Sequence, residues 1–133
     1  MSDAVAADCI FCTIAEDRIV LSSPLACVIE DGFPIAPGHS LLIPRRHVRS
    51  LFELDEEERV ALLMLLEQAK ERIAGRHRPD GYNIGINDGE AAGQTVAHLH
   101  MHLIPRYPGD GPDPRGGVRW VVPDKADYWT ERR

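Results

Sequence analysis

The chain has 133 residues, of which 44% are apolar and 27% charged, as in an average globular protein. This composition excludes a disordered chain, a collagen-like repeat and a coiled coil, and no apolar run approaches the roughly 18 residues of a membrane span. With 21 acidic and 15 basic residues the net charge is −6, which disfavours binding to a nucleic-acid polymer through its phosphates. The N-terminus lacks the pattern of a signal peptide, so we expect a cytoplasmic protein with one domain over residues 1–133.

The first third of the chain predicts a short helix followed by three strands. Asp8 is a suitable N-cap for a helix over residues 9–15, and the preceding segment 1–8 is expected to be flexible. Strands are expected over residues 18–22, 25–30 and 41–44. The segment 31–39 holds two glycines and two prolines, which predicts an ordered loop before the third strand.

One long helix is the clearest prediction. Asp55 and Glu58 have the spacing of a capping box, and the apolar run 60–66 is expected to be a buried helix face. Apolar residues recur at spacings of three and four at Leu62, Leu66, Ala69 and Ile73. Gly75 is expected to end the helix.

Two more strands are predicted in the second half, over residues 82–87 and 97–105, with a loop at 88–93 between them. Prolines and glycines concentrate after residue 105, so residues 109–133 are predicted to form an irregular C-terminal arm. Together these elements predict an α+β fold, with an antiparallel five-stranded sheet, one long helix and one short helix.

Three histidines share the last predicted strand. Because strand side chains alternate between faces, His98, His100 and His102 are expected to point the same way, with neighbours ~6.6 Å apart at Cα. Neutral imidazole is a good nucleophile near neutral pH, and a second imidazole can stabilise charge on a phosphoryl oxygen. The segment 93–95 (Gly-Gln-Thr) precedes the strand and offers backbone N–H and hydroxyl donors to an anion. The pattern therefore predicts a phosphate site.

Cys9 and Cys12 form a Cys-x-x-Cys pair, which is half of a tetrahedral zinc site when two ligands come from elsewhere. A metal-free pair of buried thiols and a redox pair remain as alternatives. No thioredoxin-like βαβ pattern surrounds the pair, which disfavours the redox alternative.

The run His98-Leu99-His100-Met101-His102-Leu103-Ile104 matches in full the His-φ-His-φ-His-φ-φ signature, where φ is apolar, and so resembles the histidine triad (HIT) superfamily. Segments 37–47, 87–89 and 93–95 extend the resemblance. It implies an antiparallel sheet with two helices, usually in a homodimer. It also implies a nucleotide hydrolase or nucleotidyl transferase acting at the α-phosphate of a nucleoside 5′-phosphate derivative, with purines favoured.

The resemblance further implies roles for individual residues. His100 would attack phosphorus and carry a covalent nucleotidyl group, His102 would contact the phosphate or the leaving group, and the main chain at His98 would orient His100. The other implied nucleotide-binding positions are Asp31 (at the ribose hydroxyls), His39, Asn87, Gly93, Gln94 and Thr95, with Thr95 also among the catalytic residues.

One branch of the superfamily is similar to this chain in carrying an N-terminal Cys-x-x-Cys. In that branch zinc is completed by the histidine of the Pro-Arg-Arg-His segment and by the first histidine of the triad. The resemblance thus implies a structural zinc ion held by Cys9, Cys12, His47 and His98. No metal is then needed at the reacting phosphate.

Two other functions fit the same residues: a nucleotide-binding sensor or scaffold with incidental turnover, and a zinc-dependent hydrolase that uses the triad as ligands. The intact middle histidine, His100, favours the enzyme over the sensor. The leaving group stays open between an amine, a nucleotide, sulfate and a sugar phosphate.

Overall fold

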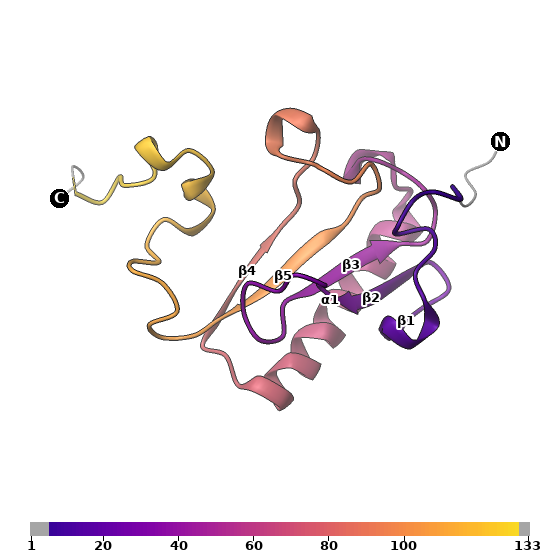
Figure 1. Ribbon diagram of the computed structural model, residues 1–133, viewed down its shortest axis with the longest axis horizontal. Helices are drawn as coiled ribbons and strands as arrows, with labels where there is room; N and C mark the ends of the chain where they lie inside the picture. The colour runs from indigo at the N-terminus through magenta and orange to yellow at the C-terminus, as the bar shows by residue number, and fades with distance from the viewer. Residues whose placement is uncertain (1–5, 131–133) are drawn as a thin grey trace.

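The computed structural model describes residues 6–130, in which five strands form one antiparallel sheet with a long helix against one face (Figure 1). The strands are β1 (Ile19–Ser22), β2 (Ala26–Glu30), β3 (Ser40–Pro44), β4 (Gly81–Gly85) and β5 (Met101–Arg106). Their order across the sheet is β1-β2-β3-β5-β4, and every neighbouring pair is antiparallel. This architecture confirms the predicted α+β fold with its five-stranded sheet.

Helix α1 (Glu56–His77) begins where the capping box predicts. The amide of Glu58 donates to Asp55 Oδ1, and the amide of Asp55 donates to Glu58 Oε1, both at 2.9 Å. The predicted end at Gly75 is wrong, because the helix continues for two more residues. It stops when Arg78 takes a left-handed conformation (φ 53°), and the proline that follows disfavours helical geometry at that position. Among residues 6–130, no helix is both long and apolar enough to cross a membrane.

One stripe of α1 packs on the sheet. Its fully buried apolar positions are Leu62, Leu65, Ala69 and Ile73. The prediction that the whole run 60–66 is buried is wrong: Val60, Leu63 and Met64 are 50%, 58% and 59% exposed. These three residues lie on the face of the helix that points away from the sheet, since positions three and four apart share a face.

The capping box is tied to the loop after β3 by a partly buried ion pair. Arg46 donates from Nε and Nη2 to the two carboxylate oxygens of Glu58 at 2.9 and 2.8 Å, and this pairing lowers the pKa of Glu58. Since the pKa in the folded state lies below that in the unfolded chain, ionised Glu58 stabilises the fold above the unfolded-state pKa. This stabilisation is lost as pH falls through the folded-state pKa.

We expect Glu58→Gln to lower the free energy of unfolding by about 2 kcal/mol at pH 7, because the amide keeps the cap but not the paired charge. The loss should shrink as pH falls toward the lowered pKa of Glu58, because the wild-type carboxylate is then itself protonated. Urea unfolding of both proteins at several pH values measures this. A loss that is the same at pH 7 and at pH 3 would contradict the assignment.

The predicted short helix over residues 9–15 is not formed. The chain makes two turns instead, in which Cys9 N donates to Ala6 O (3.0 Å) and Cys12 N donates to Cys9 O (3.2 Å). A seven-residue helix is too short to be stable without strong packing, and the turns direct both thiols to one point. Of the segment predicted to be flexible, residues 1–5 lie outside the described residues.

The predicted strand 97–105 forms only in its second part, as β5. The ladder between β3 and β5 runs from the pair Ser40 and Leu103 to the pair Leu42 and Met101 and then stops. Continuation would bring the chain opposite Pro44, which has no amide hydrogen to donate. His98 therefore lies in a bend and His100 directly before the strand, and His102 lies on it. The strand predicted over 82–87 is also shorter, as β4 ends at Gly85.

Short 3₁₀ helices occur in the rest of the described chain: η1 (Glu16–Arg18), η2 (Leu51–Glu53), η3 (Glu90–Ala92), η4 (Gly117–Val121) and η5 (Pro123–Lys125). The last two belong to the C-terminal arm, which contains no strand or α-helix up to residue 130, as predicted; residues 131–133 lie outside the described residues. The arm lies beyond β4, at the opposite end of the sheet from the N-terminal segment (Figure 1).

Candidate functional site

The histidines of the triad are placed by the alternation of the segment around β5. Leu99, Met101 and Leu103 are buried in the core that α1 covers, so the intervening residues point to the other face of the sheet. His100 and His102 are partly exposed on that face, with ring centroids 5.2 Å apart. The predicted pattern of three imidazoles backed by apolar residues is thus confirmed, although His98 is fully buried.

His98 turns toward the two thiols of the N-terminal segment. Its Nε2 donates to the carbonyl of Pro44 at 2.8 Å, which leaves the lone pair of Nδ1 directed at the cysteines. Burial lowers the pKa of His98, so the ring is neutral at pH 7. A neutral imidazole with a fixed donor on one nitrogen is the usual form of a histidine metal ligand.

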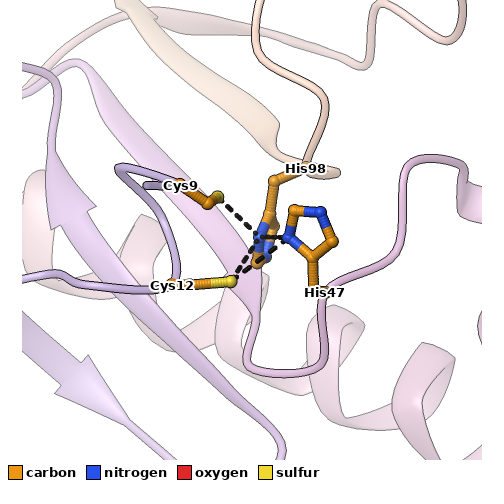
Figure 2. Close-up of side chains that lie close together, drawn as sticks. All are labelled: Cys9, Cys12, His47 and His98. Carbon is orange, nitrogen blue, oxygen red and sulfur yellow. Dashed lines mark hydrogen bonds between the residues drawn. The ribbon is translucent and has the colours of Figure 1, made fainter. Parts of the chain in front are cut away.

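Figure 2 shows the side chains of Cys9, Cys12, His47 and His98 converging on one point. Cys9 Sγ and Cys12 Sγ lie 3.4 and 3.5 Å from His98 Nδ1, and the two histidine Nδ1 atoms lie 3.2 Å apart. Around a tetrahedral zinc ion, bonds of ~2.1 Å to nitrogen and ~2.3 Å to sulfur put neighbouring ligand atoms roughly 3.4 to 3.8 Å apart. The four residues therefore fit a zinc ion with little movement, and they include both ligands expected from distant segments.

His100 has one ring nitrogen occupied and one available. Its Nδ1 donates to the carbonyl of His98 at 2.9 Å, so in the neutral ring the lone pair lies on Nε2. Nε2 forms no hydrogen bond within the described residues. Phe11 lies beside this ring, with centroids 4.9 Å apart, and limits the directions in which the imidazole can turn. This arrangement suits a nucleophile.

His102 is oriented by a chain of hydrogen bonds. The amide of Ile35 donates to His39 Nδ1 at 3.2 Å, so neutral His39 carries its proton on Nε2. That nitrogen lies 3.0 Å from His102 Nδ1 and 3.3 Å from Asp31 Oδ2. Because His39 Nε2–H donates to His102 Nδ1, the proton of His102 is on Nε2. Burial lowers the pKa of both imidazoles and so favours these neutral forms.

A pocket of about 870 Å³ opens beside these residues. Four of the predicted nucleotide-binding residues line it: Asp31, His39, Asn87 and His102. The other four predicted residues, Gly93, Gln94, Thr95 and His100, do not line it. Gln94 instead braces the loop, since its Oε1 accepts from Gly89 N at 2.8 Å and its Nε2 donates to Arg49 O and Val96 O at 3.0 Å.

The C-terminal arm supplies pocket residues that the sequence analysis does not identify. Val118, Trp120 and Val121 line the pocket together with Phe33 and Ile35 of the loop after β2. The sequence pattern does not predict this placement, because apolar residues of the arm recur with neither the helical nor the strand period. The position of the arm depends instead on its contacts with β4. The one indication in the sequence is that apolar residues (Val118, Trp120 and Val121) follow two glycines in a segment without a predicted helix or strand.

The chain is similar in sequence and in structure to known proteins. A family model described as HIT domain matches residues 13–109. A crystal structure of a HIT family protein from Bacillus anthracis is 33% identical, with a TM-score of 0.73 and 82% of each chain covered. A diadenosine triphosphate hydrolase from Plasmodium falciparum is 28% identical, with a TM-score of 0.70, and the match covers 75% of this chain and 68% of that one. A protein of Mycobacterium tuberculosis named AP-4-A phosphorylase is 35% identical over 96 residues, which are 71% of this chain and 49% of that protein.

Proposed function

The chain belongs to the HIT domain family, and from this premise we propose that it is a nucleotide hydrolase or nucleotidyl transferase that works through a covalent nucleotidyl group on His100. Two relatives support this class of reaction by their names, one a phosphorylase of AP-4-A and the other a hydrolase of diadenosine triphosphate. The substrate is a nucleoside 5′-phosphate derivative, with a purine base favoured.

The proposal depends on how the His100 ring is hydrogen-bonded. Its Nδ1–H is fixed on a backbone carbonyl, which cannot take up the proton, so the lone pair on Nε2 is held ready to attack. In the first step a bond forms between Nε2 and the α-phosphorus while the bond from phosphorus to the leaving group breaks. Water then attacks the same phosphorus and releases the nucleoside monophosphate and free His100.

His102 assists the first step. Its Nε2–H donates a hydrogen bond to a phosphoryl oxygen as negative charge develops there. Because burial favours the neutral form of His102, a departing amine takes its proton from solvent water, and the attacking water releases a proton to solvent in the second step. His39 keeps His102 in the required tautomer, and Asp31 on the same chain of contacts accepts from the ribose hydroxyls. Asn87 and the segment 93–95 complete the nucleotide site, with Gln94 acting through the loop that it braces.

We further propose that zinc binds Cys9, Cys12, His47 and His98 as a structural ion. The ion would link three segments that are distant in the sequence, and His100 is not one of its ligands. A hydrolase that uses the whole triad as zinc ligands is less well supported, since His98 alone of the three faces the thiols. The exposed apolar residues of α1 (Val60, Leu63 and Met64) support a homodimer. We also propose a cytoplasmic location, where the thiols of the chain stay reduced.

The test is to mix the protein with adenosine 5′-phosphoramidate, quench it in the millisecond range and measure its intact mass. We expect a transient adenylyl adduct that is labile in acid and maps to His100. Slow binding of nucleotide without any adduct and without turnover would support the sensor or scaffold instead. Turnover without an adduct, lost when zinc is removed from a still folded protein, would support the zinc hydrolase.

A further inference from the structure

We infer that Asp88 is a positioning residue for the proposed reaction, and that its carboxylate fixes the loop 88–94 relative to His100. This loop lies between β4 and β5 (Figure 1). Asn87 precedes the loop and Thr95 follows it, and the proposed function assigns both residues to the nucleotide. The inference therefore deepens the proposed function and rests on it.

The loop is closed on itself by a reciprocal pair of hydrogen bonds. The amide of Gln94 donates to Gly89 O at 3.1 Å, and the amide of Gly89 donates to Gln94 Oε1 at 2.8 Å. Gly89 and Gly93 have φ values of 97° and 94°, a conformation that lets the chain turn sharply at both ends of η3. Because the two ends are bonded to each other, a contact at either end sets the position of both Asn87 and Thr95.

Asp88 fastens this closed loop to the start of η2. Its Oδ2 accepts one hydrogen bond from the hydroxyl of Ser50 and one from the amide of Leu51, both at 3.0 Å. Gln94 Nε2 adds a third bond, to Arg49 O at 3.0 Å. The Asp88 side chain is partly buried, so water competes less for these bonds than at an open surface. Two of the three bonds thus depend on a single carboxylate oxygen.

The start of η2 is in turn bonded to the triad segment. The amide of Leu99 donates to Val48 O at 2.7 Å, directly before the nucleophile His100. Glu53 Oε1 accepts from the amides of the two residues that follow Val48, at 3.0 and 3.1 Å, which fixes the backbone between that contact and η2. A continuous path of backbone and hydrogen bonds therefore connects Asp88 to the segment that holds the nucleophile.

This path should matter more for the reaction than for binding of the nucleoside. Contacts to phosphoryl oxygens gain strength as negative charge develops in the transition state, and a displacement of ~1 Å can cost about 100-fold in rate. Asp31 and His39 lie on the loop after β2 and share no hydrogen bond with Asp88 within the described residues. Loss of the carboxylate should therefore lower kcat far more than it weakens nucleotide binding.

The test measures kcat with adenosine 5′-phosphoramidate and the dissociation constant of adenosine 5′-monophosphate. We expect Asp88→Ala to lower kcat about 30-fold and to change the dissociation constant less than about threefold. Asp88→Asn should keep kcat within about threefold of wild type, because one amide oxygen can accept both hydrogen bonds.

Glu90→Ala is the matched control, since Glu90 is an exposed acid of the same loop whose side chain forms no hydrogen bond or ion pair within the described residues. Its kcat should stay within about twofold of wild type. Ser50→Ala removes one of the two bonds to Asp88 and should lower kcat about fivefold, which keeps the inference testable if Asp88→Ala does not fold. Thermal unfolding shows which variants are folded at the assay temperature.

Unchanged kcat in folded Asp88→Ala, or in Ser50→Ala where Asp88→Ala does not fold, would overturn the inference. So would an equal loss of kcat and of nucleotide binding, which indicates general loosening of the site. If Asp88→Asn were as slow as Asp88→Ala, the charge and not the hydrogen-bond geometry would matter, and Asp88 would not be a positioning residue. Absence of turnover and of adduct in the wild-type protein would instead overturn the proposed function, and this inference with it.

Discussion

Replacement of His100 by alanine should lower kcat at least about 10⁴-fold and abolish the covalent adduct. The reason is that the variant loses the atom that bonds to phosphorus, and the residues around it offer no equivalent. His100 is partly exposed and its ring packs against Phe11 without supporting the core, so the fold should survive. Steady-state kinetics with an adenosine 5′-phosphoramidate, intact mass and circular dichroism measure these three outcomes.

His102→Ala is the informative control for this experiment. It removes the ring that donates to the phosphoryl oxygen but leaves His100 and its bond to the His98 carbonyl intact. We expect kcat to fall by about 10²-fold to 10³-fold, with the adduct still detected at long reaction times. If His100→Ala kept appreciable turnover while His102→Ala lost all of it, the nucleophile would be wrongly assigned.

Loss of the zinc site should produce the largest effect on stability. We expect Cys12→Ser, or removal of the metal by a chelator, to lower the free energy of unfolding by at least about 3 kcal/mol. Zinc would link the N-terminal turns, the loop after β3 and the segment before β5, and Cys12 is near both histidines of the cluster, 3.2 Å from His47 Nδ1 and 3.5 Å from His98 Nδ1. Thermal unfolding with and without chelator, together with elemental analysis, measures this.

Cys27→Ala is the control that distinguishes the stability lost with the metal from the stability lost by removing any buried thiol. Cys27 is buried in the sheet among apolar residues and is not part of the cluster, so the variant should keep its zinc and lose about 1 kcal/mol. Wild-type protein that contains no zinc after native purification, and whose unfolding a chelator does not change, would contradict the proposed site. Adduct formation should also slow when zinc is removed, because His98 carries the carbonyl that orients His100.

Much of the fold could be predicted because local patterns and long-range packing agree. The alternation around β5 and the cap at Asp55 each depend on a few neighbouring residues, and both predictions were confirmed. The errors occurred where packing outweighs local preference. Residues 9–15 have the apolar spacing of a helix, yet the chain there turns so that two thiols meet histidines from residues 47 and 98.

The sequence by itself determined which groups are available for chemistry: an unbroken triad, a thiol pair, and the order of segments that matches the HIT family. The tertiary structure alone decided which nitrogen of each ring is free, since the acceptors for His98 and His100 are carbonyls whose positions depend on where β3 ends and β5 begins. It also decided that the arm lines the pocket. The physical reason is the same in both cases: hydrogen-bond direction and the shape of a pocket arise from segments distant in the chain, and no local period records their approach.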